Sequence, residues 1–234
     1  MARWLARSWN ERAKITGIEV NFMKTMIAIP CMDSLPLGFV QSLLYSQKGE
    51  NVTVQFKANS LIYDSRNLLS LMAIEDGFDR VMWIDSDMMF THDAIKMLHE
   101  DMDLYKCDMV TGLYFKRTGM SLPVIYEELE IPTEEEGKPV RRIHEYMNYP
   151  QDTVFPVRGC GFGFVMTSTK LLKEVWDKFG PAFTPYPWAG EDISFCHRVN
   201  QLGHVIWCDS CITCGHIGTW VFTEDTYKAM RGDK

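Results

Sequence analysis

The fold of this chain is decided by the stretch VMWIDSDMM at residues 81–89. Its first four residues are apolar, and a short apolar run between polar neighbours predicts a strand that is buried on both faces of a parallel sheet. Asp85 and Asp87 follow at the end of this strand, where open α/β sheets place their ligand sites. Because residues two apart on an extended chain point to the same side, we expect the two carboxylates to face one point.

Two carboxylates that face one point repel each other unless a cation lies between them. Hard oxygen donors suit Mg²⁺ or Mn²⁺, and proteins commonly hold Mg²⁺ through one or two carboxylates together with substrate phosphates. The stretch therefore predicts a divalent metal ion bound with a phosphorylated ligand at Asp85 and Asp87. For the D-x-D pattern alone, a solvated turn that contains two acids is the simpler interpretation.

Composition restricts the class of protein. The chain has 234 residues, 46% of them hydrophobic, which fits one large domain with a sizeable core. A net charge of −7 argues against coating nucleic acid through a broad basic surface. Seven cysteines at scattered spacing are typical of a reduced, cytoplasmic protein rather than a disulfide framework. The sequence contains no apolar run long enough for a transmembrane helix.

Residues 1–23 form a distinct basic arm in which Trp4, Leu5 and Trp9 are interleaved with arginines. Their spacing predicts a modestly amphipathic helix. We expect this arm to dock against the rest of the protein. Peripheral contact with a membrane or binding to a partner helix are the alternatives.

Residues 24–234 are predicted to form a single domain with two dissimilar halves. Three consecutive β-α units indicate a parallel nucleotide-binding half at 24–115, whereas 116–234 is a mixed, irregular half suited to a second substrate. The segments 124–129 and 140–147 are expected to pair around an acidic loop at 133–137, and Thr91 and Ser168 are expected to cap helices. Strands are predicted at 24–30, 51–57, 80–84, 108–115, 124–129, 140–147, 154–157, 161–167 and 204–208, and helices at 36–49, 61–75, 92–101, 168–179 and 192–202.

Two further stretches carry residues suited to chemistry. In WAGEDISFCHR at 188–198, Glu191 and Asp192 open a helix, where the dipole favours negative charge, so both are explained equally as ordinary helix-start acids. In DSCITCGHIG at 209–218, His216 follows a late strand. A lone histidine is more commonly a surface or hydrogen-bonded core residue than a metal ligand.

Taken in this order, the segments resemble the metal-dependent GT-A glycosyltransferases, of the family-two type, over residues 24–218. The matching parts are the opening strand into Pro30, the D-x-D at 85–87, the glycine-rich GCGFG at 159–163, the E-D pair at 191–192 and the late His216. This resemblance implies an α/β fold of GT-A type, in which a Rossmann-like nucleotide-binding half with a mixed central sheet is fused to an irregular acceptor half.

The resemblance also implies roles for the charged residues. Asp85, Asp87 and His216 would hold Mn²⁺ or Mg²⁺, which neutralises a departing nucleoside diphosphate. Asp192 would act as the general base on the acceptor hydroxyl, and Glu191 would orient the acceptor or the sugar. An acid at this position favours transfer with inversion, although some retaining enzymes carry one as well.

Further residues are expected to contact the nucleotide-sugar donor. The expected donor is a UDP-sugar, and a GDP-sugar is the next candidate. Plainer interpretations remain for Arg66 as a surface charge, for Gly161 and Gly163 as tight packing, and for Trp188 as a core aromatic. The acceptor stays undetermined among a saccharide, a protein, a lipid-linked sugar, a small metabolite and a modified nucleic-acid base. The expected donor-site residues are Pro30, Arg66, Asn67, Asp85, Ser86, Gly161, Gly163 and Trp188.

Three alternatives to a glycosyltransferase site are compatible with parts of the sequence. A sugar-1-phosphate nucleotidyltransferase shares the α/β half, but its first loop carries glycines and a basic residue that the loop 30–34 lacks. A non-catalytic sugar-nucleotide binding module would have no use for Asp192 beside a metal. Cys208, Cys211, Cys214 and His216 have the spacing of a zinc knuckle, for which reduced buried thiols are the more ordinary alternative.

Overall fold

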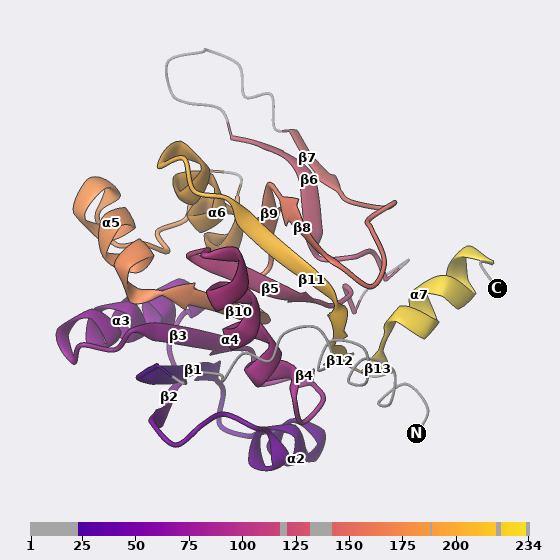
Figure 1. The fold of residues 1–234 in the computed structure, drawn as a ribbon, viewed down its shortest axis with the longest axis horizontal. Helices are drawn as coiled ribbons and strands as arrows, with labels where there is room; N and C mark the ends of the chain where they lie inside the picture. Colours follow the sequence, from indigo (N-terminus) through magenta and orange to yellow (C-terminus); the bar gives the residue numbers. More distant parts are fainter. Residues whose placement is uncertain (1–22, 118–120, 132–141, 188, 219–220, 233–234) are drawn as a thin grey trace.

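A computed structural model describes residues 23–117, 121–131, 142–187, 189–218 and 221–232. Its centre is a seven-stranded sheet in the order β2-β1-β3-β10-β5-β11-β8 (Figure 1). The strands of this sheet are β1 (Thr25–Cys31), β2 (Val52–Ala58), β3 (Arg80–Ile84), β5 (Met109–Leu113), β8 (Val154–Val157), β10 (Phe164–Ser168) and β11 (Ile206–Thr213). The helices are α2 (Leu37–Tyr45), α3 (Ile62–Glu75), α4 (Ala94–Tyr105), α5 (Thr169–Phe179), α6 (Glu191–Gln201) and α7 (Glu224–Arg231).

The first half of the sheet is parallel, as the sequence predicts. Strand β1 pairs in parallel with both β2 and β3, and β5 pairs in parallel with β11. The sheet becomes mixed because β10 runs antiparallel between β3 and β5, and β8 runs antiparallel at the edge. A mixed central sheet of this kind confirms the expected α/β fold class.

Helices cover both faces of the sheet, so alternate residues of a central strand enter different cores. In β3, Val81 and Trp83 pack with residues of α3, α5 and α6, whereas Met82 and Ile84 pack with residues of α2 and α4. In Figure 1, α2 lies at the bottom of the view and α5 and α6 toward the top, with the sheet between them. Burial on both faces is the reason that this strand is apolar throughout.

A second, three-stranded sheet belongs to the irregular half. It has the order β7-β6-β9, formed by β6 (Ile125–Glu130), β7 (Arg142–Glu145) and β9 (Gly159–Cys160). Strands β6 and β7 pair antiparallel, which confirms the predicted hairpin. Its acidic loop at 133–137 lies outside the described residues, as do residues 1–22 of the basic arm.

A third sheet, which the sequence does not predict, joins two distant segments. It has the order β13-β12-β4, formed by β4 (Met88–Met89), β12 (Gly215–Ile217) and β13 (Val221–Phe222). The register places His216 opposite Met88, one residue after the second acid of the D-x-D. This small sheet is what brings the late histidine to the acids.

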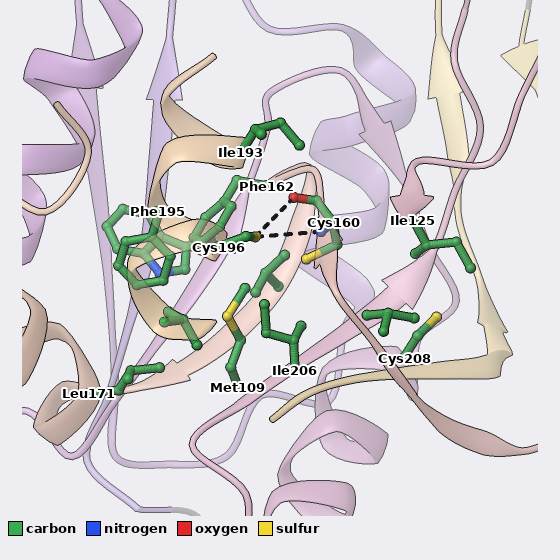
Figure 2. Packing of buried hydrophobic residues seen from close by; sticks show 14 of the residues in the cluster. Met109, Ile125, Cys160, Phe162, Leu171, Ile193, Phe195, Cys196, Ile206 and Cys208 are labelled. Carbon is green, nitrogen blue, oxygen red and sulfur yellow. Dashed lines mark hydrogen bonds between the residues drawn. The ribbon is translucent and has the colours of Figure 1, made fainter. Parts of the chain in front are cut away.

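The buried face of helix α6 packs against β9 and against aromatic residues of the core. The Cys196 thiol donates a hydrogen bond to the Cys160 carbonyl oxygen at 3.4 Å, and the Cys160 N–H approaches the same sulfur at 3.5 Å (Figure 2). On the same helix, the Phe195 ring stacks on Phe183 at 4.6 Å between centroids and meets Phe162 edge-on at 5.1 Å. These contacts hold the buried face of α6 against the core.

Local predictions are confirmed at one helix start and wrong at two other places. Ser168 caps α5 by accepting a hydrogen bond from the Leu171 N–H. Thr91 does not cap α4; the cap position is Asp93, whose carboxylate accepts a hydrogen bond from the Thr91 hydroxyl. Residues 161–163, predicted as strand, form a turn between β9 and β10. Within the described residues, no helix is long and apolar enough to cross a membrane.

Candidate functional site

The D-x-D occupies a turn at the end of β3 rather than an extension of the strand. The Met88 N–H donates to the Asp85 carbonyl oxygen at 3.1 Å, which closes the turn. The expectation of an extended segment was therefore wrong, and the two carboxylates do not meet the same partners. The Asp85 side chain faces Arg66, whereas the Asp87 side chain faces Arg117 and His216.

Arg66 connects the first acid to the E-D pair from inside the protein. Its guanidinium donates to Asp85 Oδ1 at 2.8 Å and to the Phe162 carbonyl oxygen at 3.2 Å, and its Nε lies 3.4 Å from Glu191 Oε1. The side chain is only 2% exposed, and the ring of Phe162 lies against the guanidinium. The interpretation of Arg66 as a surface charge is therefore wrong.

Asp87 and His216 form the second part of the site. Nε2 of His216 lies 3.5 Å from Asp87 Oδ2, and Nδ1 lies 2.9 Å from the Phe115 carbonyl oxygen. Because a carbonyl oxygen only accepts hydrogen bonds, Nδ1 must carry a proton, and the other ring nitrogen faces the carboxylate. A histidine held through one nitrogen by a backbone carbonyl is the usual arrangement of a metal-ligating imidazole.

The electrostatics of the two acids differ. Burial raises the pKa of Asp85, and the nearby Arg66 guanidinium opposes this rise only in part. Burial also acts on Asp87, but hydrogen bonding to His216 and the charge of Arg117 outweigh it, so the pKa of Asp87 is lowered. The pKa of His216 is raised, because its contacts with Asp87 and the Phe115 carbonyl outweigh burial. The surroundings of Asp87 therefore favour its ionised form, whereas burial disfavours that of Asp85.

Glu191 and Asp192 form the first turn of α6, as the sequence predicts. Asp192 Oδ1 accepts a hydrogen bond from the Ile193 N–H at 2.7 Å. Gly190 makes room for this carboxylate, because a Cβ on Gly190 would lie 2.7 Å from Asp192 Oδ1. Burial, and then the charge of Glu191, raise the pKa of Asp192 to about 6. A carboxylate with this pKa is suited to accept a proton near neutral pH.

The glycine-rich turn wraps around a buried tyrosine. The Gly163 N–H donates to the Tyr114 hydroxyl at 3.0 Å, and the Gly163 carbonyl accepts from the Asp85 N–H at 3.0 Å. A Cβ on Gly161 would lie 2.1 Å from the Tyr114 hydroxyl oxygen. Packing against Tyr114 therefore accounts for the glycine at 161, and a role for Gly161 and Gly163 in contacting a sugar stays a prediction.

The remaining expected donor-site residues lie at varied positions. Pro30 is buried near the carboxyl end of β1, and Ser86 is half-buried in the D-x-D turn. The Asn67 side chain accepts a hydrogen bond from the Phe183 N–H at 2.7 Å, so it holds the chain that precedes α6. Trp188 lies outside the described residues.

The chemistry of the donor set is compatible with a divalent cation held by few protein ligands. Within the part of the chain that the structure describes, no group of three or more His, Cys, Asp or Glu side chains is arranged to hold a metal ion. Asp87 and His216 supply one oxygen and one nitrogen at close range. Mg²⁺ sites commonly use one or two protein ligands and complete their coordination with substrate phosphates and water.

The late cysteines lie in two different cores. Cys208 packs in the core that contains α3, α5 and α6, whereas Cys214 packs in the core that contains α2 and α4, with Cys211 partly buried against the latter. Residues three apart on a strand point to opposite faces, which explains why Cys208 and Cys211 lie in different cores.

Sequence reasoning missed two residues of the site, Arg117 and Tyr114. Arg117 donates to Asp87 Oδ2, and its half-exposed side chain also lies 3.3 Å from the Ile217 carbonyl oxygen. Tyr114 lies near the end of the segment predicted as a strand at 108–115, and Arg117 lies two residues after that segment. Asking which polar side chains lie at the carboxyl end of that strand, as for β3, would have identified both.

Comparison with known proteins gives a fold but no sequence family. No protein-family model and no curated protein sequence matches the chain. Among solved structures, the chain is similar to A197 from STIV, with a TM-score of 0.61 and 20% identity over 84% of this chain and 86% of that one. It is also similar to GalNAc-T7, solved with UDP, GalNAc and Mn²⁺, with a TM-score of 0.55 and 10% identity.

The chain has a GT-A glycosyltransferase fold. The GalNAc-T7 match covers 92% of this chain but only 48% of GalNAc-T7, so the shared part is one region of a longer protein. At these identities the likeness concerns the fold alone, and the expected fold class is confirmed.

Proposed function

We propose that this chain is a metal-dependent glycosyltransferase that moves a sugar from a nucleotide-sugar to an acceptor hydroxyl with inversion. The observation that carries the proposal is the meeting of three separate segments at the carboxyl end of β3. The D-x-D turn, the start of α6 and strand β12 each bring an ionisable side chain there, and Arg66 links Asp85 to Glu191.

Asp87 and His216 would hold a divalent cation together with the oxygens of the donor diphosphate, and Asp85 would contact the ribose or a metal-bound water. When bound, the cation would act as a Lewis acid that neutralises charge on the departing diphosphate. The backbone supports this role, since the Ile217 N–H donates to the Asp87 carbonyl oxygen at 2.7 Å and ties the two segments together. Arg66, buried behind Asp85, would keep that carboxylate in place.

Asp192 would remove the proton from the acceptor hydroxyl as that oxygen attacks the anomeric carbon. Its raised pKa makes it a better proton acceptor than an ordinary aspartate, and it is still ionised at neutral pH. Glu191, held by Arg66, would orient the acceptor or the sugar. Direct attack by an activated hydroxyl gives inversion at the anomeric carbon.

The donor half would be residues 24–115 and the acceptor half residues 116–234, with Pro30, Asn67, Ser86, Gly161, Gly163 and Trp188 contributing to the nucleotide-sugar surface. A UDP-sugar is the first donor to test, because the GalNAc-T7 structure holds UDP and Mn²⁺ on the same fold. The acceptor would be a hydroxyl compound such as a saccharide, a protein side chain or a modified nucleic-acid base.

The test is release of UDP or GDP from a panel of nucleotide-sugars, measured with Mn²⁺ and again with excess EDTA. Hydrolysis by water is read in the absence of acceptor, and transfer is read with pooled saccharide, peptide and hydroxylated-base acceptors. The proposal predicts release that EDTA abolishes and that Asp192→Asn lowers while Mn²⁺-dependent UDP binding persists. Release without metal, or binding with no turnover in any pool, would contradict it.

A further inference from the structure

Arg117 contacts Asp87 and has no part in the proposed binding of the metal ion or in the transfer step. Its Nη1 donates to Asp87 Oδ2, the same oxygen that His216 Nε2 approaches to 3.5 Å. The same Nη1 lies 3.3 Å from the Ile217 carbonyl oxygen, on the strand that carries His216. One carboxylate oxygen therefore faces two cationic or ligating groups from two different segments.

The two arginines of the site differ in freedom to move. The Arg66 side chain is 2% exposed and is held by Asp85, Glu191 and the Phe162 carbonyl. The Arg117 side chain is 49% exposed, and its aliphatic part lies beside Gly218, where an added Cβ would meet Arg117 Cβ and Cδ at 3.5 Å. The guanidinium of Arg117 can therefore change partners while its stem stays in place.

A divalent cation between Asp87 and His216 would be attracted to the oxygen that Arg117 contacts, and two cations at one oxygen repel each other. The guanidinium would then need another anion. A guanidinium stays positively charged and presents a planar fork of donors that matches phosphate oxygens. The diphosphate of the donor is the anion that the proposed function brings to this position.

We infer that Arg117 is a diphosphate-binding residue, which Asp87 holds beside the site until a cation takes its place and which then contacts the donor diphosphate. This inference rests on the proposed function. It gives Arg117 opposite effects on two ligands: it competes with the cation for Asp87, and it strengthens binding of the nucleotide. A residue that only supported the loop would affect both ligands in the same direction.

The test compares Arg117→Gln and Arg117→Lys with the unmodified chain by calorimetric titration. The first titrant is MnCl₂ alone, and the second is UDP or GDP, whichever the unmodified chain binds, at saturating Mn²⁺. Arg142→Gln is the matched control, because Arg142 is likewise exposed (55%) and pairs with an acid, Glu130, on the separate β6–β7 hairpin. Thermal unfolding of each variant checks that the fold is kept.

We expect Arg117→Gln to lower affinity for the diphosphate by about 10- to 100-fold, the usual value of hydrogen bonds to a charged group, and to raise affinity for Mn²⁺ alone, because Asp87 loses its competing cation. Arg117→Lys should keep part of the diphosphate affinity, and Arg142→Gln should match the unmodified chain. A loss of diphosphate affinity below tenfold in Arg117→Gln, or an affinity for Mn²⁺ alone that is unchanged or lower, would overturn the inference. If the unmodified chain itself binds neither nucleotide with Mn²⁺, the proposed function has failed instead.

Discussion

Replacing Asp192 with asparagine should make the protein more stable while removing its activity. Burial and the charge of Glu191 raise the pKa of this carboxyl from 3.8 to about 6 in the folded protein. A rise of roughly two pKa units corresponds to about 3 kcal/mol at 1.36 kcal/mol per unit. Ionised Asp192 therefore costs the folded state about this much, and asparagine, which does not ionise, avoids that cost.

The pH dependence fixes the sign of the effect. Between pH 3.8 and about pH 6 the folded protein binds the extra proton, so its stability falls as the pH rises through this window, and the full cost is present above it. The stability of Asp192→Asn relative to the unmodified chain should therefore increase by about 2 kcal/mol between pH 4 and pH 7.5. The same carboxyl should give kcat/KM a rising limb with an inflection near pH 6 and lose roughly 10²–10⁴-fold in the variant.

Urea unfolding at the two pH values measures the first effect, and nucleotide release measures the second. Asp177→Asn is the control, because Asp177 is 60% exposed and pairs with Lys173 on the surface of α5; its effect on stability should stay within about 0.5 kcal/mol at both pH values. A stability gain of Asp192→Asn that is the same at pH 4 and pH 7.5 would refute the reasoning. So would unchanged turnover.

Two further substitutions test how the site is built. Gly190→Ala places a Cβ 2.7 Å from Asp192 Oδ1, so the carboxylate must move. Turnover should therefore fall at least about tenfold while Tm changes by only a few degrees, and unchanged turnover would contradict this. Tyr114→Phe removes the acceptor of the buried Gly163 N–H, so urea unfolding should show a loss of about 1–3 kcal/mol. Tyr45→Phe, at a residue 75% exposed, should show almost none, and equal losses would contradict this reasoning.

The sequence was sufficient to predict strands β1 and β3 at the centre of the sheet, because both carry the apolar pattern that burial on both faces requires. The strand at 80–84 has the bounds predicted, and the parallel pairing of β1, β2 and β3 follows from short alternating strands and helices. The helix cap at Ser168 could be predicted because a serine hydroxyl that precedes a helix accepts a hydrogen bond from a backbone N–H of the first helical turn, here that of Leu171. These features depend on nearby residues.

The features that the sequence could not reveal depend on contacts between distant segments. Strand β12 pairs with β4, more than a hundred residues earlier, and both strands are too short to have a recognisable pattern. The turn at the D-x-D also looks extended in sequence, since the hydrogen bond from Met88 that closes it leaves no compositional signal. The order of motifs therefore predicted which segments matter, and the structure shows which of their side chains are neighbours.

The central claim is that His216 and Asp87 hold a divalent cation with the donor nucleotide. The most direct measurement is pulsed electron paramagnetic resonance of Mn²⁺ bound to the unmodified chain with UDP, which detects nitrogen ligands through their nuclear spin. We predict coupling to one imidazole nitrogen that disappears in His216→Gln, whereas His144→Gln, at an exposed histidine paired with Glu128, keeps it. Bound Mn²⁺ without nitrogen coupling, or coupling that survives in His216→Gln, would contradict the account.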